Sequence, residues 1–185
     1  MRSQLNSRIF QTPTGSSVQL CLDRPHQFMI NNQQQLLPNW DRPVTYIVIL
    51  LQQSRFSLKE LTSDVAQEKD NLRAKFIRFG CDLIFALKDH NYQSDLFDPR
   101  TGYPLLTRQG EVTVNDNAVV EAVLGYPLTS YHNCSLLTHP MWENAVYPST
   151  VVTSAPLETL KPIIDGVVAL QKWKKCSDDL LKHKL

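Results

Sequence analysis

The hydrophobic residues of the chain gather into segments that differ in period. From Val44 to Leu51 nearly every residue is apolar and several are β-branched, which predicts a strand buried on both faces. From Asp64 to Leu87 the apolar residues recur at three- and four-residue steps, which predicts a helix with one apolar stripe. The stripe consists of Leu72, Phe76, Phe79, Leu83 and Leu87. Ser63 or Asp64 can cap this helix, and Gly80 inside it suggests a closely packed neighbour.

Shorter elements follow this helix. Asp98 to Gly102 has Asp, Pro and Gly at places that favour a turn. A short helix is predicted from Asn115 to Leu124, and Gly125 is the residue type favoured just past a helix end. Cys134 to Thr138 and Tyr147 to Thr153 are predicted to be strands.

A last helix is predicted from Leu157 to Lys174, with Leu160, Ile164 and Val167 on one side. Pro162 cannot lie deep in a straight helix, so the helix should either start near Lys161 or bend there. Strands and helices are mixed without a regular βαβ repeat. The predicted class is therefore α+β, with a mixed or antiparallel sheet and flanking helices.

The distribution of polar residues suggests three parts. Residues 1–43 are rich in Gln, Asn, Ser and Pro, and we expect a loosely structured N-terminal arm with one strand, Ser17 to Leu22. Residues 44–174 are expected to form a single α+β domain. Residues 175–185 are expected to be a polar tail.

Charge and composition exclude several classes. The 185 residues carry 19 basic against 18 acidic side chains, so the chain lacks the basic excess of a nucleic-acid-binding protein. The longest apolar run, Tyr46 to Leu51, is too short to cross a bilayer, and we expect no membrane association. Scattered cysteines without a signal peptide favour reduced thiols in the cytoplasm. Arg2 and Arg8, without any acid in the first 22 residues, keep a mitochondrial location as the alternative.

Cys134 is the first candidate for chemistry. As a thiolate it could act as a nucleophile or as a soft metal ligand. If the segment is an extended strand, His132 and Cys134 share one face and Asn133 lies on the other. The alternative is a small buried hydrophobic residue, which is the commonest fate of a free cysteine. A zinc site with His132 and His139 matches no common spacing.

The rest of the sequence offers weaker signals. No GxGxxG, GxxxxGK or GxSxG motif occurs, so the usual phosphate loops and hydrolase elbow are missing. Trp142, Tyr131 and Tyr126 could wall a pocket for a flat ligand or lie in the core. Cys21 and Cys81 are expected to be structural, and Cys176 to be exposed.

The order of the motifs along the chain resembles that of a known protein family. An Asp95-x-x-Asp98-Pro99-x-x-Gly102 turn follows the long helix, and Leu124-Gly125-Tyr126 and Cys134-x-x-x-x-His139-x-x-Trp142 come next. Val151-Val152-Thr153-Ser154-Ala155-Pro156 closes the series. Over residues 44 to 160 this resembles the C-terminal domain of the methylmalonic aciduria and homocystinuria type D protein family.

The resemblance implies a cobalamin-trafficking protein. Members of this family fold like nitroreductases but are not known to use flavin, so we expect no flavin here. They work with a cobalamin-processing type C protein and direct cobalamin towards methionine synthase or methylmalonyl-CoA mutase. The implied mechanism is coordination of the cobalt of cob(II)alamin by a cysteine thiolate, which favours a handling protein over an enzyme.

The chain departs from the family pattern at one position. Two adjacent cysteines are expected where Asn133 and Cys134 stand, and the first of them is the expected cobalt ligand. Cys134 is therefore the candidate metal ligand, and Asn133, His132, His139 and Trp142 complete the candidate cofactor-binding set. Either a bulge or loop turns Cys134 towards cobalt, or cobalt is bound differently or not at all. A flavin- or thiol-dependent reductase and a non-catalytic interaction module are the alternative functions.

Overall fold

The computed structural model describes residues 7–131 and 134–176. The strands in this part of the chain are β1 Ser7–Gln11, β2 Ser17–Asp23, β3 Tyr46–Gln53, β4 Ser94–Leu96, β5 Leu128–Tyr131, β6 Cys134–Leu137, β7 Val146–Thr153 and β8 Lys174–Lys175. The helices are α1 Gln27–Asn31, α2 Gln33–Leu36, α3 Ser63–Asp89, α4 Asp116–Leu124 and α5 Leu157–Leu170. β4-β7-β3-β2-β1-β8 is the order of a six-stranded antiparallel sheet, and β5 pairs with β6 apart from it. The predicted α+β class is confirmed, while likeness to nitroreductases stays a prediction.

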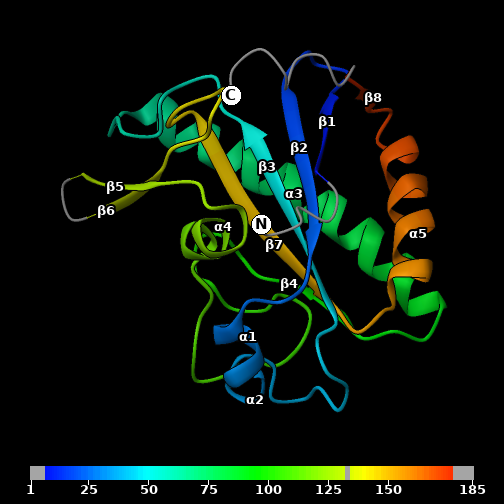
Figure 1. Ribbon diagram of the computed structural model, residues 1–185. Helices are drawn as coiled ribbons and strands as arrows, with labels where there is room; N and C mark the ends of the chain where they lie inside the picture. The colour runs from blue at the N-terminus through cyan, green and yellow to red at the C-terminus, as the bar shows by residue number, and fades with distance from the viewer. Residues whose placement is uncertain (1–6, 132–133, 177–185) are drawn as a thin grey trace.

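Helices cover both faces of the sheet (Figure 1). α3 and α5 lie on one face, and α1, α2 and α4 lie on the other. β3 is central, between β2 and β7, and its residues from Tyr46 to Gln52 are all buried. An apolar side chain on either face of β3 therefore enters one of two cores, which explains the unbroken apolar run.

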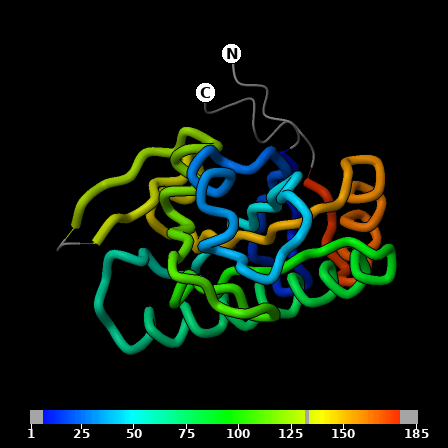
Figure 2. Tube along the Cα trace, turned by 90° about the horizontal axis from the view of Figure 1, so that it is seen from below, coloured from blue at the N-terminus to red at the C-terminus, as the bar shows by residue number. Residues whose placement is uncertain are grey.

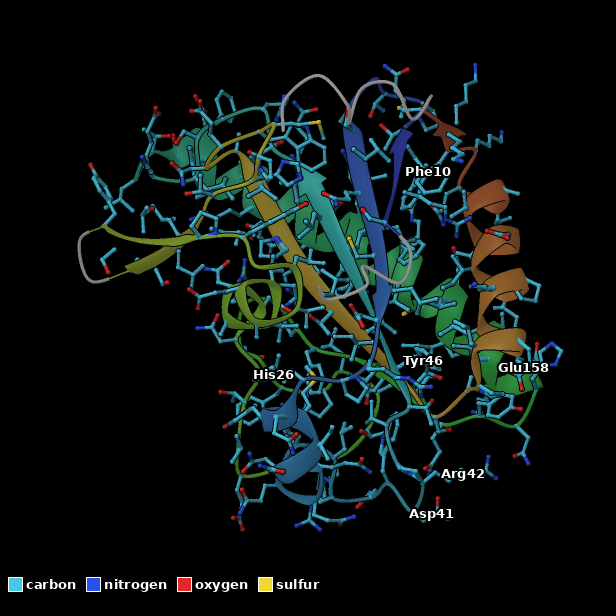
Figure 3. All side chains as sticks on the ribbon, in the orientation of Figure 1. Phe10, His26, Asp41, Arg42, Tyr46 and Glu158 are labelled. Carbon is cyan, nitrogen blue, oxygen red and sulfur yellow. The ribbon has the colours of Figure 1, made fainter. Side chains whose placement is uncertain are left out.

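The core beneath α3 and α5 extends along the whole sheet. Phe10 on β1 and Tyr46 on β3 both belong to it and lie towards opposite ends of the sheet (Figure 3). The apolar stripe predicted for α3 faces this core, since Leu72, Phe76, Phe79, Leu83 and Leu87 are all buried. A side chain at Gly80 would meet Leu96 of β4 at 3.4 Å, so the glycine does mark close packing.

The beginning of α3 differs from the sequence prediction by one residue. Thr62, rather than Ser63 or Asp64, is the N-cap, and its hydroxyl accepts a hydrogen bond from the amide of Val65. Thr62 is extended and can therefore place its side chain across the first turn. None of the helices in the described ranges has both the length and the apolar character of a membrane span.

The N-terminal segment is built into the fold, and the expected loose arm is wrong for its described part. β2 pairs with β3 over six residues, and β1 pairs with β2 over five. Val18, Leu20 and Leu22 point into one core while Cys21 points into the other. The composition of residues 7–43 is polar, but the alternating apolar positions of β2 are enough to place it inside the sheet.

The C-terminal elements also differ from prediction. α5 begins at Leu157, so the start near Lys161 is wrong, and Pro162 lies inside the helix. Pro162 removes one backbone donor, but the buried stripe of Leu160, Ile164, Val167 and Val168 holds the helix on the sheet. The polar tail predicted from residue 175 is wrong at its first residue, because Lys175 pairs with β1 together with Lys174.

Candidate functional site

A surface groove of about 630 Å³ lies beside the β5-β6 pair. The first half of α3, the turn at residues 99–102, the start of α4, β6 and the start of β7 contribute its walls. β5 and β6 project from the body on the side away from α5 (Figure 2). The groove therefore lies between this projecting strand pair and the body of the domain.

Cys134 lies on the rim of this groove. It is the first residue of β6, its side chain is exposed, and it pairs with Tyr131 at the end of β5. β5 and β6 are two antiparallel strands rather than one, so alternation along a single strand cannot relate Cys134 to the residues of β5. His132 and Asn133 lie outside the described residues.

His139 lies in the interior, away from the rim. It is 1% exposed and comes after the end of β6, in a bridge with Glu143. Its Nε2 donates to Gln19 Oε1 at 2.6 Å, since Nδ1 accepts from the amides of Met141 and Trp142. Both nitrogens are thus engaged, and burial lowers the pKa of His139 to about 4.

Trp142 lies next to His139 in the core on the α4 side of the sheet. The two rings are stacked with centroids 4.0 Å apart, and Tyr126 meets His139 edge-on at 5.3 Å. The phenol of Tyr126 also contacts the Gln19 side chain. Of the sequence candidates in the described residues, Cys134 therefore faces solvent, whereas His139 and Trp142 form an internal support for the base of β6.

The other cysteines have different surroundings. Cys21 is buried, and burial raises the pKa of its thiol to about 11. Cys81 and Cys176 are half-buried, so Cys176 is less open than expected. Within residues 7–131 and 134–176, no group of three His, Cys, Asp or Glu side chains is placed to hold a metal ion.

The Asp98 to Gly102 turn forms one wall of the groove. Gly102 has φ +74°, and its amide donates to Asp98 O over 2.7 Å. Asp98 accepts two 2.7 Å hydrogen bonds from the guanidinium of Arg73 on α3, and this contact holds the pKa of Asp98 below its usual range. The predicted turn is therefore fastened to α3 by an ion pair.

Two residues that line the groove were not among the candidates predicted from the sequence. Asp116, the first residue of α4, is buried on the groove wall and accepts a 2.6 Å hydrogen bond from Thr150 of β7. Tyr147 of β7 lines the same groove. In sequence, Asp116 looks like an ordinary acid in the first turn of a helix, and only the packing of α4 on β7 reveals its burial.

These features define an α+β domain that presents one exposed thiol at the edge of a surface groove. Residues 5–163 match the sequence profile of the methylmalonic aciduria and homocystinuria type D protein family, and the chain belongs to that family. The match begins before β1, so it takes in the N-terminal strands that the resemblance above left out.

A curated relative gives a second comparison. The chain is similar to the "Cobalamin trafficking protein CblD" of Rattus norvegicus, with 21% identity over 126 residues. The similar region is 68% of this chain and 43% of the rat protein. The chain thus matches less than half the length of that relative.

Proposed function

We propose that this protein takes part in cobalamin trafficking by presenting the thiolate of Cys134 to the cobalt of cobalamin. Family membership supports the process, as does the name of the rat relative. The observation that carries the proposal is the position of Cys134. It is exposed at the rim of the groove, whereas Cys21, Cys81 and Cys176 are buried or half-buried.

The chemistry needs only a ligand exchange. The thiol of Cys134 would lose its proton to solvent, and its sulfur would then donate a lone pair to cobalt in place of the nitrogen donor of the nucleotide tail, which leaves cobalt with its own electron pair. The oxidation state of cobalt does not change. A polarizable thiolate suits a soft metal centre of this kind.

The size of the groove supports a cobalamin site that this protein shares with a partner protein. About 630 Å³ falls within the range of pockets for drug-sized ligands, and cobalamin, a corrin with a nucleotide tail, is larger than that. We therefore propose that the groove contacts one edge of cobalamin while a type C-like partner covers the rest. Delivery to methionine synthase or methylmalonyl-CoA mutase belongs to the same proposal.

The buried candidates have a supporting role in this proposal. His139 and Trp142 hold the chain that follows β6, and Asn144 donates from its side chain to Leu137 O at 2.9 Å. These contacts fix the inner end of β6 and hence the direction in which Cys134 is presented. His132 and Asn133 precede Cys134 directly, and we propose that they flank the cobalt contact.

Titration of cob(II)alamin into the purified protein, alone and with a type C-like protein, tests the proposal. We expect a change in the absorbance spectrum and a complex in gel filtration, with Cys134→Ser removing the spectral change. Asn133→Cys restores the residue expected from the family pattern and should strengthen the change. Absence of both spectral change and complex under every condition would reject the proposal.

A further inference from the structure

The backbone of β5 points alternately towards β6 and towards its outer edge, the side of β5 opposite β6. Thr138 N, just after β6, donates to Pro127 O, just before β5. Hydrogen-bonded and non-hydrogen-bonded pairs alternate along an antiparallel ladder, so Thr129 bonds to β6 while the N–H and C=O groups of Leu128 and Ser130 point outward. These four outward groups make no hydrogen bond to residues 7–131 or 134–176.

The free edge of β6 shows the same alternation. Ser135 and Leu137 direct their carbonyl oxygens away from β5, and these oxygens accept from the side chains of Asn117 and Asn144. β6 also lines the groove, whereas no residue of β5 does. The outer edge of β6 therefore faces the body of the domain, and the outer edge of β5 faces away from it on the projecting pair (Figure 1).

The two edges of the six-stranded sheet are protected in ways that the edge of β5 is not. Leu105 donates from its amide to Leu96 O, so a loop covers β4. β8, at the other edge, carries two exposed lysines, Lys174 and Lys175. Covering loops and charged side chains are usual means by which an edge strand avoids pairing with another chain. β5 is uncharged and largely exposed, so its edge is open to a further strand.

We propose that the outer edge of β5 pairs with β5 of a second copy of this chain, antiparallel, with Thr129 opposite Thr129 on the two-fold axis. In this register Leu128 of each copy and Ser130 of the other exchange their outward backbone hydrogen bonds. All four outward groups of each copy are then satisfied. The product is a four-stranded sheet in the order β6-β5-β5-β6.

The side chains of β5 suit a copy of the same strand. Opposite residues of antiparallel strands lie on one face, so Tyr131 of one copy meets Pro127 of the other. This contact covers the ring of Tyr131, which is 44% exposed. The two Thr129 side chains meet on the axis, and Thr–Thr pairs are favourable cross-strand neighbours. Residues 126–131 carry no charge, so two copies do not repel each other there.

The dimer should be weak because its contact is small. A specific interface of standard size buries about 800 Å² on each partner, and two four-residue strands bury less. The dimer should therefore be half formed only at roughly 0.5 mM protein. Cys134 and the groove remain open in it, because only the far edge of β5 is used. The pairing depends on neither Cys134 nor cobalt, so it goes beyond the proposed function.

Sedimentation equilibrium of the full chain, from about 10 μM to about 1 mM, tests the dimer. The apparent mass should rise from that of a monomer towards that of a dimer. In ¹⁵N–¹H correlation spectra over the same range, the amides of Leu128 and Ser130 should shift with concentration, and the amide of Thr129, already bonded to β6, should shift less. A monomer at the highest concentration would overturn the proposal.

Charges on the axis test the register. Thr129→Lys and Thr129→Glu each place like charges opposite each other, and each should weaken self-association about tenfold or more. An equimolar mixture of the two variants should restore the dimer, because a lysine then faces a glutamate. Thr14→Lys, at the exposed turn between β1 and β2, is the matched control and should associate like the unmodified protein. Unchanged association of Thr129→Lys, or a mixture that stays monomeric, would contradict the register.

A proline separates the outer edge from the hairpin itself. Ser130→Pro removes an outward N–H but no hydrogen bond between β5 and β6, so it should abolish the dimer while the shifts of β6 residues persist. A chain that stays monomeric yet binds a type C-like protein, and loses that binding in Ser130→Pro, would overturn the proposal. That outcome would assign the edge to a strand of the partner protein.

Discussion

The imidazole of His139 lies parallel to the indole of Trp142, with centroids 4.0 Å apart and 9° between the ring planes. The same imidazole is hydrogen-bonded through both nitrogens, to Gln19 and to the backbone at residues 141 and 142. One side chain thus joins β2 of the sheet to the chain that follows β6. This internal contact therefore supports β6, the strand that carries Cys134 at the rim of the groove.

We expect His139 to remain neutral, with its proton on Nε2, down to about pH 4. Burial lowers its pKa from the ordinary 6.5 to about 4, so its contribution to stability is full above pH 6.5 and is lost as pH falls through 4. Nitrogen chemical shifts of labelled histidine measure the tautomer and the titration directly. Titration of His139 near pH 6.5 would show that the ring is solvated and that the support for β6 is looser than described.

The Arg73–Asp98 ion pair should contribute much more to the free energy of unfolding than the Arg100–Asp70 pair does. Asp98 is buried, and Arg73→Met would leave its charge without a partner at a cost of about 2–3 kcal/mol in unfolding free energy. Both members of the second pair are exposed, so Arg100→Met should cost less than about 1 kcal/mol. Urea unfolding measures the free energy of unfolding of both variants. Equal losses of free energy in Arg73→Met and Arg100→Met would contradict the prediction.

Gly102 should tolerate no side chain. Its φ is +74°, and an added Cβ would lie 2.3 Å from the carbonyl oxygen of Val114. Gly102→Ala should therefore lower the free energy of unfolding by about 2 kcal/mol or more. Gly166 in α5 has open space around it, so Gly166→Ala is the control and should stabilise by up to about 1 kcal/mol. Thermal unfolding of both variants measures these changes in stability. A Gly102→Ala variant as stable as the unmodified protein would mean that the turn can rearrange to accept a side chain.

Asp116→Asn should change how stability depends on pH. The folded pKa of Asp116 is raised from 3.8 to about 7, so its contribution is full below pH 3.8 and is lost as pH rises through 7. The variant should therefore gain stability relative to the unmodified protein between pH 4 and 7, by roughly 1–3 kcal/mol in total. The difference between the two proteins at each pH cancels the opposite contribution of His139. A difference that stays constant across this range would show that Asp116 is ionised throughout.

The parts of the fold that sequence predicted well are those with a strong local period. The stripe of α3 and the apolar run of β3 needed no knowledge of their partners. β1 and β8 were missed because such short strands at one side of the sheet depend on the strands with which they pair. The stacking of Trp173 on Phe79, at 5.2 Å, helps to bring β8 to the sheet, and no local pattern announces such a contact.

The candidate site also contains some residues that a local sequence pattern predicted and others that it did not. The cysteine and its flanking motifs were visible in sequence, and Cys134 does lie on a groove. Strand alternation could not place it, because β5 ends at Tyr131 and β6 begins at Cys134. The burial of Asp116 depends on Thr150, 34 residues further along the chain. Titratable groups of this kind become visible only when distant elements are packed together.

Electron paramagnetic resonance of cob(II)alamin bound to the protein, with the type C-like partner present, tests the proposed cobalt contact most directly. Nitrogen-14 has a nuclear spin that splits the lines of Co(II), whereas the common isotope of sulfur has none. We predict a bound spectrum without nitrogen splitting for the unmodified protein and for the control Cys176→Ser, and retained nitrogen splitting for Cys134→Ser. A Cys134→Ser spectrum identical to that of the unmodified protein would contradict the claim that Cys134 binds cobalt.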